Sequence, residues 1–267
     1  MAQTIAEIED RSVISPMMQK YIETKEANKD CILFYRLGDF YEMFFEDALI
    51  AARELEITLT GKDCGLPERA PMAGIPHHAA EVYAEKLIEK GYKVAICEQL
   101  EDPKTAKGIV KRGVIRVVTP GTVIESNMLE EKKNNYIMSI VKKGIYYGIA
   151  VCDVTTGDFY STEIKENNNF PLVLDEIARY SPAELVVNSM MYDSKEEIGK
   201  IKERFEIYFT RFNDKFFSED INTIVENYNL VDNDDNPIKD IDKRLFSVAS
   251  INALVEYLKQ TQKTSLE

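Results

Sequence analysis

Four aromatic side chains lie within the ten residues 35–44, and Gly38-Asp39 interrupts this segment. The apolar and aromatic residues before the interruption are too β-prone for a helix and favour a strand. A strand cannot bury four aromatic rings on one face, because its side chains alternate between two faces. If Tyr41 points inward, Phe40 and Glu42 therefore share the opposite face.

A phenylalanine beside a glutamate on an exposed face has two interpretations. The first is an ordinary aromatic core that other elements cover. The second is a wedge, an apolar ring that enters the minor groove of a DNA duplex, unstacks a base step and kinks the helix. The pattern alone leaves both interpretations open.

The composition is that of a globular protein. The chain has 267 residues, of which 45% are hydrophobic and 30% charged, enough for one large domain or two of ordinary size. It contains no apolar run of 18 residues, and its first residues lack the basic and apolar parts of a signal peptide. Four separated cysteines without a CxxC pair indicate reduced thiols in a cytosolic protein.

The net charge argues against nucleic acid, but its distribution is uneven. Lys and Arg number 33 and Asp and Glu 46, so the chain carries −13 and should repel a polyanion. Residues 1–123 hold 16 basic and 20 acidic side chains, or −4, and residues 124–267 hold 17 and 26, or −9. Residues 103–116 carry five basic side chains and no acidic one, a run usually found on a solvated face.

Hydrophobic periodicity predicts a mixed α/β region that ends near Thr122, followed by an antiparallel meander and then βα units. Residues 71–78 (PMAGIPHH) contain two prolines and a glycine, which commonly interrupt regular structure, and are expected to form an ordered turn. We expect a strand from residue 31, helices over residues 16–27, 44–57, 79–90, 170–180, 195–205 and 244–262, and further strands over 57–61, 93–100, 114–123, 135–143, 145–154, 157–164, 183–188 and 206–211.

Several kinds of active site are excluded by the sequence. It contains neither GxxxxGK[ST] nor GxGxxG, so an NTPase loop and a dinucleotide fingerprint are absent. The only histidines, His77 and His78, are adjacent in the expected turn and cannot both face one metal ion with ordinary geometry. Because both histidines lie in this one turn, no Ser-His-Asp or Cys-His arrangement is expected.

One enzymatic alternative stays open. Asp153 and Asp158 bracket a strand end, where nucleases and phosphotransferases hold Mg²⁺, and Glu184 and Asp214 are further carboxylates. The simpler explanation is turn chemistry, because aspartate commonly closes turns by hydrogen bonds to its own backbone. The alternative function is therefore a Mg²⁺-dependent nuclease or phosphotransferase on the second domain.

Three stretches, GDFYEMF, PMAGIPHHAAEVYAEKLIEKGYKVAICEQLEDP and RVVTPGTV, resemble the N-terminal part of the MutS family of mismatch-recognition proteins. They follow the order and nearly the spacing of that family, closely over residues 15–125 and more loosely beyond. The resemblance implies a small mixed α/β mismatch-recognition domain at 1–123 and a ribonuclease-H-like connector domain at 124–241. Residues 242–267 would begin a helical lever domain, truncated in this chain.

The resemblance also implies site residues. Phe40 would be the stacking wedge and Glu42 its partner, which we expect to hydrogen-bond the displaced base and to disfavour perfect duplex. An unpaired carboxylate at that place would be repelled by DNA. Met72 lies in the family's loop near DNA, whereas His77 and Arg116 are expected to be structural. The candidates for phosphate contacts are Lys104, Lys107, Lys111 and Arg112.

The implied partners are mismatched double-stranded DNA and, through the connector domain, MutL. The family's ATPase, clamp and dimer contacts would lie beyond residue 267, so ATP and Mg²⁺ are not expected to bind here. We expect no catalysis, a monomer for this fragment, a homodimer for the full-length protein, and weak DNA binding by the fragment. The resemblance implies a bacterial cytoplasmic, nucleoid-associated protein.

Overall fold

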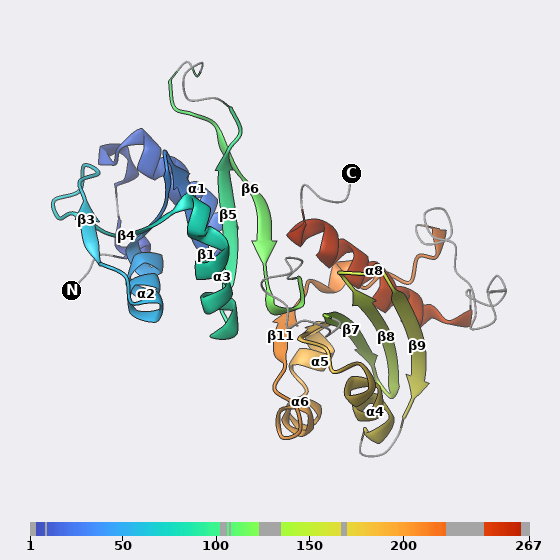
Figure 1. The fold of residues 1–267 in the computed structure, drawn as a ribbon. Helices are drawn as coiled ribbons and strands as arrows, with labels where there is room; N and C mark the ends of the chain where they lie inside the picture. The colour runs from blue at the N-terminus through green and yellow to red at the C-terminus, as the bar shows by residue number, and fades with distance from the viewer. Residues whose placement is uncertain are drawn as a thin grey trace. The chain divides into compact units, whose positions relative to one another are not determined.

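The computed structural model describes residues 4–8, 10–101, 106, 108–122, 135–166, 170–222 and 243–262. Contacts divide the chain into two compact units, Met1–Pro120 with Thr261–Glu267, and Gly121–Gln260. Each unit combines helices with one sheet, so the expected α/β class is confirmed (Figure 1). The domain boundaries expected at residues 123 and 241 stay predictions. In the described part of the chain, no helix is long and apolar enough to cross a membrane.

The first unit is built on a six-stranded sheet in the order β3-β4-β2-β1-β5-β6. Strands β1 and β5 run parallel, and every other neighbouring pair is antiparallel. The elements are η1 (Ile5–Glu7), η2 (Arg11–Val13), α1 (Pro16–Ala27), β1 (Cys31–Leu37), β2 (Phe40–Phe44), α2 (Phe45–Leu55), β3 (Thr60–Lys62), β4 (Ala70–Pro76), η3 (His77–Ala79), α3 (Ala80–Glu89), β5 (Lys93–Gln99), β6 (Arg112–Val118) and η4 (Pro120–Thr122).

Strand β1 is buried on both faces of this sheet. Leu33 and Tyr35 pack with Tyr21 of α1 in one cluster. The alternate residues Ile32 and Phe34 are buried on the other face. Helix α2 contacts β4, β2 and β1, and helix α3 contacts β5 and β4.

The expected turn over residues 71–78 is wrong, because β4 occupies most of it. This strand pairs with β2 on one side and β3 on the other. Pro71, Ala73 and Ile75 are buried at alternate positions, the period of a strand. The proline and glycine pattern indicated a break in the backbone, but tertiary pairing on both edges imposed an extended conformation.

The second unit has a five-stranded sheet in the order β11-β10-β7-β8-β9. The predicted meander β7-β8-β9 is antiparallel, and β10 and β11 add in parallel on the β7 side. This mixed sheet agrees with the ribonuclease-H-like expectation. The elements are β7 (Tyr136–Lys143), β8 (Tyr146–Asp153), β9 (Phe159–Lys165), α4 (Pro171–Tyr180), β10 (Glu184–Val187), α5 (Ser189–Tyr192), α6 (Lys195–Lys202), β11 (Tyr208–Arg211), η5 (Asp214–Phe216) and α8 (Leu245–Thr261).

Helices cover both faces of the second sheet. Met138 of β7 packs with α4, α5 and α6 residues in one cluster, and its neighbour Ile137 packs with α8 residues in another. The N-terminus of α8 lies so close to β8 that a Cβ atom on Gly148 would be 1.8 Å from the carbonyl oxygen of Phe246. Helix α8 therefore covers one face of this sheet. Its assignment to a further domain stays a prediction.

The four cysteines are free and buried. Burial raises the pKa of Cys31 and of Cys97 to about 12, and that of Cys152 to about 11. Because the thiolate is the reactive form, these thiols are expected to be inert in the folded chain.

Candidate nucleic-acid interface

A tight hairpin between β1 and β2 presents Phe40. Leu37 pairs with Phe40, so Gly38-Asp39 form a two-residue connection, and Gly38 has φ +60°, as such connections require. The side chain of Phe40 is 49% exposed, whereas Tyr41 is 5% exposed. The inward Tyr41 confirms the predicted alternation and leaves Phe40 and Glu42 on the opposite face.

The tip of this hairpin is attached to the end of β4. The backbone N–H of His77 donates to the carbonyl oxygen of Asp39 at 2.9 Å. The ring nitrogen Nδ1 of His77 lies 3.1 Å from the same oxygen. His77 thus contacts the backbone that precedes Phe40 and holds the turn in place, a structural role.

A polar network supports the hairpin on the face opposite Phe40. The Tyr41 hydroxyl donates to Glu98 of β5, and Arg36 Nη1 donates to the same carboxylate at 3.1 Å. Arg36 Nε also donates to the carbonyl oxygen of Gly38 at 2.6 Å. Burial and the Glu98 carboxylate raise the pKa of Tyr41, so its hydroxyl remains a donor. The sequence pattern does not reveal this network, because its members meet only when β5 lies beside β1.

The other end of the hairpin is anchored by buried polar groups. The Tyr21 hydroxyl accepts a hydrogen bond from the backbone N–H of Phe44 at 3.1 Å. The Asp47 carboxylate accepts from the backbone N–H of Leu33 at 2.9 Å and pairs with Lys25 at 2.8 Å. Burial raises the pKa of Asp47, and the Lys25 ammonium opposes that shift. Helices α1 and α2 are thereby tied to both strands that carry the exposed ring.

Glu42 has a partner that the sequence did not reveal. Its Oε2 atom lies 2.6 Å from Nζ of Lys62 on β3, and its side chain is only 17% exposed. The concern about an unpaired carboxylate beside DNA therefore does not hold for this chain. Lys62 is twenty residues away in sequence, and only the strand order β3-β4-β2 brings it near.

The basic run is described only in part. Lys104 and Lys107 lie outside the described residues. Lys111 is exposed, whereas Arg112 donates to the carbonyl oxygens of Arg36 at 2.7 Å and Val110 at 2.9 Å. Arg112 thus braces the first sheet, and the phosphate contacts of all four candidates stay predictions.

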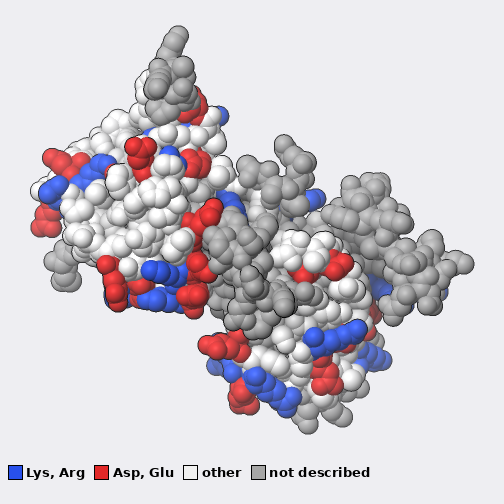
Figure 2. All heavy atoms as spheres, viewed as in Figure 1, with Lys and Arg blue, Asp and Glu red and all other residues white. Residues whose placement is uncertain are grey.

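Met72 lies on β4 directly opposite Phe44, partly buried against the core cluster that contains Tyr21. This packing gives Met72 a structural role, and its contact with DNA stays a prediction. On the faces visible in Figure 2, basic and acidic side chains are interspersed, so this view shows no continuous positive surface.

The four carboxylates of the nuclease alternative serve turns and packing. Asp153 Oδ1 accepts from the backbone and hydroxyl of Thr155, and Asp214 accepts from the backbone N–H of Ser189. Asp158 accepts from the Thr156 hydroxyl. In the described ranges, no three His, Cys, Asp or Glu side chains could jointly hold a metal ion. Glu184 is buried and accepts from Thr210 Oγ1, Tyr257 Oη and the backbone N–H of Gly121.

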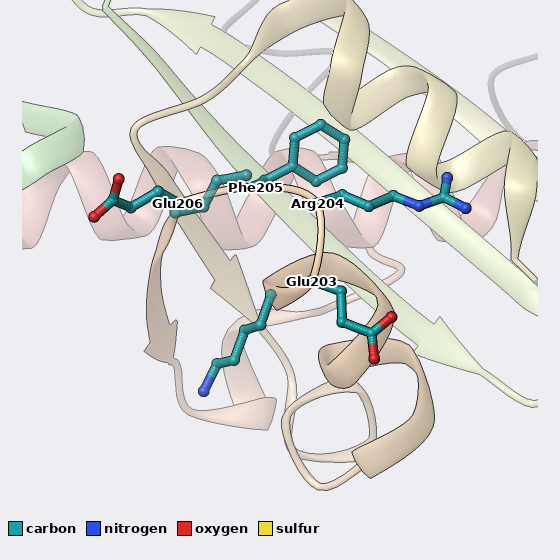
Figure 3. A pocket seen from close by; sticks show the side chains of 6 residues that line it. Glu203, Arg204, Phe205 and Glu206 are labelled. Atoms are coloured by element: carbon teal, nitrogen blue, oxygen red, sulfur yellow. The ribbon is translucent and has the colours of Figure 1, made fainter.

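A hollow on the second unit does not bring together a set of side chains that could form an active site. It is lined by the consecutive residues 202–207 between α6 and β11. Glu203, Arg204 and Glu206 point in different directions (Figure 3). The exposed Phe40 with its paired Glu42 is therefore the best-supported site of the described chain.

Comparisons with known proteins match both units. Residues 15–127 match the family MutS domain I, and residues 135–267 match MutS domain II. The chain is 58% identical over 258 residues to the DNA mismatch repair protein MutS of Acetivibrio thermocellus, covering 95% of this chain and 29% of that protein. It is 52% identical to the protein of the same name in Ruminiclostridium cellulolyticum and 48% identical to that of Caldanaerobacter subterraneus, covering 28% and 29% of their lengths. The chain thus spans under a third of these relatives.

Proposed function

Because the chain belongs to the MutS family, we propose that its first unit recognises mismatched and unpaired bases in duplex DNA. The observation that carries the proposal is the exposed ring of Phe40 on a hairpin that hydrogen bonds hold at its tip, at its base and on the opposite face. An exposed phenylalanine without such anchoring would simply be a poorly buried residue. In this chain the hydrogen bonds of the hairpin hold Phe40 where its ring would enter a groove of the DNA duplex.

The wedge would discriminate by the deformability of the duplex. Unstacking a base step costs a few kcal/mol, and the cost is smallest where the base is mispaired or unpaired. The ring of Phe40 gains the same stacking contact with any base, because every base has a π-face. Recognition would therefore depend on the local weakness of the duplex and not on its sequence.

Glu42 would add a contact that forms only with a displaced base. Its carboxylate stands on the same face as Phe40, two positions along β2. We propose that it accepts a hydrogen bond from a base that the wedge has displaced and repels a fully stacked duplex. Glu42→Gln should then tighten binding to matched duplex more than to mismatched duplex. Equal tightening of both would contradict this role.

The second unit would be the connector that contacts MutL. Its match to MutS domain II and its mixed sheet support this assignment. The proposal includes no catalytic step and no cofactor for this chain. ATP and Mg²⁺ binding, and homodimer formation, would belong to the longer members of the family.

Binding by fluorescence anisotropy at low salt tests the proposal. The probes are one matched duplex and the same duplex with a single unpaired thymine. We expect Phe40→Ala to weaken binding to the unpaired-thymine duplex by about tenfold, since stacking of a base on an aromatic ring contributes about 1–3 kcal/mol. Its effect on matched duplex should be smaller.

The matched control is Val82→Ala, which truncates another half-exposed apolar side chain, on α3. It should leave both affinities unchanged. A Phe40→Ala chain that stays folded and keeps its preference for the unpaired thymine would disprove recognition by the wedge.

A further inference from the structure

Lys62 enters the site from a strand that the recognition hairpin does not include. It ends β3, which lies two strands away from β2 in the sheet. Its ammonium lies 2.6 Å from Oε2 of Glu42 and 5.5 Å from the centre of the Phe44 ring. The side chain thus extends along the face that carries Phe40 and ends at the carboxylate beside it.

The ion pair is sheltered rather than freely exposed. The side chain of Glu42 is 17% exposed and that of Lys62 33%. A carboxylate with so little access to water is costly without a cation. Gly74 stands directly opposite Glu42 on β4 and brings no side chain of its own to the carboxylate. Lys62 is therefore positioned to offset the charge of Glu42 and to fix its orientation.

We propose that Lys62 is a positioning residue of the recognition site and acts through Glu42. By binding Oε2 it fixes the carboxylate and leaves Oε1 available to a base, because among the described residues only Lys62 hydrogen-bonds this carboxylate. Its charge also offsets that of Glu42 when phosphates approach. This inference rests on the proposed function and adds to it a residue that positions the Glu42 carboxylate.

A second explanation makes a different prediction. Lys62 could simply contact a phosphate, as many lysines at DNA interfaces do. A phosphate contact would be lost to the same extent whether or not residue 42 carries a charge, and its loss would lower the salt slope of binding by about one. Action through Glu42 instead makes the effect of Lys62 depend on that carboxylate.

The test is a double-mutant cycle of Lys62→Met and Glu42→Gln in the 267-residue chain. Affinity for the duplex with one unpaired thymine is measured by anisotropy at low salt. We expect Lys62→Met alone to weaken binding about three- to tenfold, as contacting charged pairs do in such cycles, and to have less than about a twofold effect in the Glu42→Gln chain. Lys62→Arg should restore most of the affinity, because it can still pair with Glu42.

Lys86→Met is the matched control, since it removes one positive charge from an exposed position of helix α3. It should change affinity less than Lys62→Met. Circular dichroism establishes that each variant is folded, and Lys62→Gln, which keeps a polar side chain of similar length, replaces the Met variant if that variant unfolds.

Equal losses in both backgrounds, with wild-type binding dependent on Phe40, would overturn the action of Lys62 through Glu42 and leave the wedge intact. Wild-type binding that does not depend on Phe40 would overturn the proposed function, and with it the role of Lys62. The two failures are therefore distinguishable within one set of titrations.

Discussion

The two sheets of this chain use their polar and aromatic side chains in opposite ways. The second sheet is covered by α4, α5 and α6 on one face and by α8 on the other. Its buried Glu184 accepts hydrogen bonds from three protein groups. The first sheet leaves Phe40 half exposed, and among the described residues it gives the neighbouring Glu42 one partner on one oxygen. A carboxylate surrounded by donors stabilises a fold, whereas one with a free oxygen beside an exposed ring can bind a ligand.

The comparison also shows where rigidity is needed. An exposed ring can act on a duplex only if the hairpin behind it does not yield. The contacts of Arg36, Tyr41 and His77 supply this support from the protein side. In the second unit, the hydrogen bonds of Asp153, Asp214 and Glu184 described above hold turns and the packing of the sheet.

The largest expected effect is on the closure of the second sheet. Gly148→Ala would place a methyl group where the carbonyl oxygen of Phe246 now lies, 1.8 Å from the ideal Cβ position. Helix α8 would have to shift away from β8, at a cost of about 3 kcal/mol. Hydrogen exchange of the α8 amides should become much faster, while the amides of the first unit remain protected.

Gly199→Ala is the control, because a Cβ there meets nothing within 4 Å. It should leave stability unchanged or raise it by up to about 1 kcal/mol, since alanine favours a helix over glycine. If the hydrogen-exchange rates of the α8 amides do not change in Gly148→Ala, helix α8 does not cover this face of the second sheet tightly. The contrast between the two sheets would then weaken.

A smaller effect is expected from the support of the hairpin. Tyr41→Phe removes the hydroxyl that donates to Glu98 and should lower the free energy of unfolding of the first unit by about 1.5 kcal/mol. If this network positions Phe40, the preference for unpaired thymine should also fall. Tyr92→Phe serves as the control, because the Tyr92 hydroxyl donates a 3.3 Å hydrogen bond to Glu54 and neither residue belongs to the hairpin. Lost stability with an unchanged preference would limit the network to a structural role.

The smallest effect concerns acid stability of the second unit. Burial raises the pKa of Glu197, but hydrogen bonds from Lys142 and Ser194 lower it more, to about 2, against 4.5 for the free side chain. The contribution of the Glu197 carboxylate to the free energy of unfolding is therefore complete above pH 4.5 and is lost as the pH falls toward 2. After allowance for solvent screening it should be about 1 kcal/mol. Glu197→Gln should reduce the acid sensitivity in urea titrations, and Glu196→Gln, on the exposed turn of the same helix, should not.

Local sequence determined most of the elements. The Pro16–Ala27 helix was predicted with its observed bounds, and the meander and the later βα units follow from periodicity and turn residues. That Tyr41 and Phe40 point to opposite faces also follows from alternation along one strand. Each of these features depends on residues that are neighbours in sequence, so the pattern of side chains is sufficient to predict it.

Tertiary structure decided the rest. Residues 71–78 carry the signals of a turn, yet they extend as β4 because strands pair with both of its edges. Glu98 reaches Tyr41 only because β5 lies beside β1, and Lys62 reaches Glu42 only because of the strand order β3-β4-β2. Strand order joins residues that are far apart in the chain, and no local preference encodes it. The sequence by itself determined that Phe40 and Tyr41 point to opposite faces of the sheet, whereas the fold decided which of the two rings is exposed and which charges surround it.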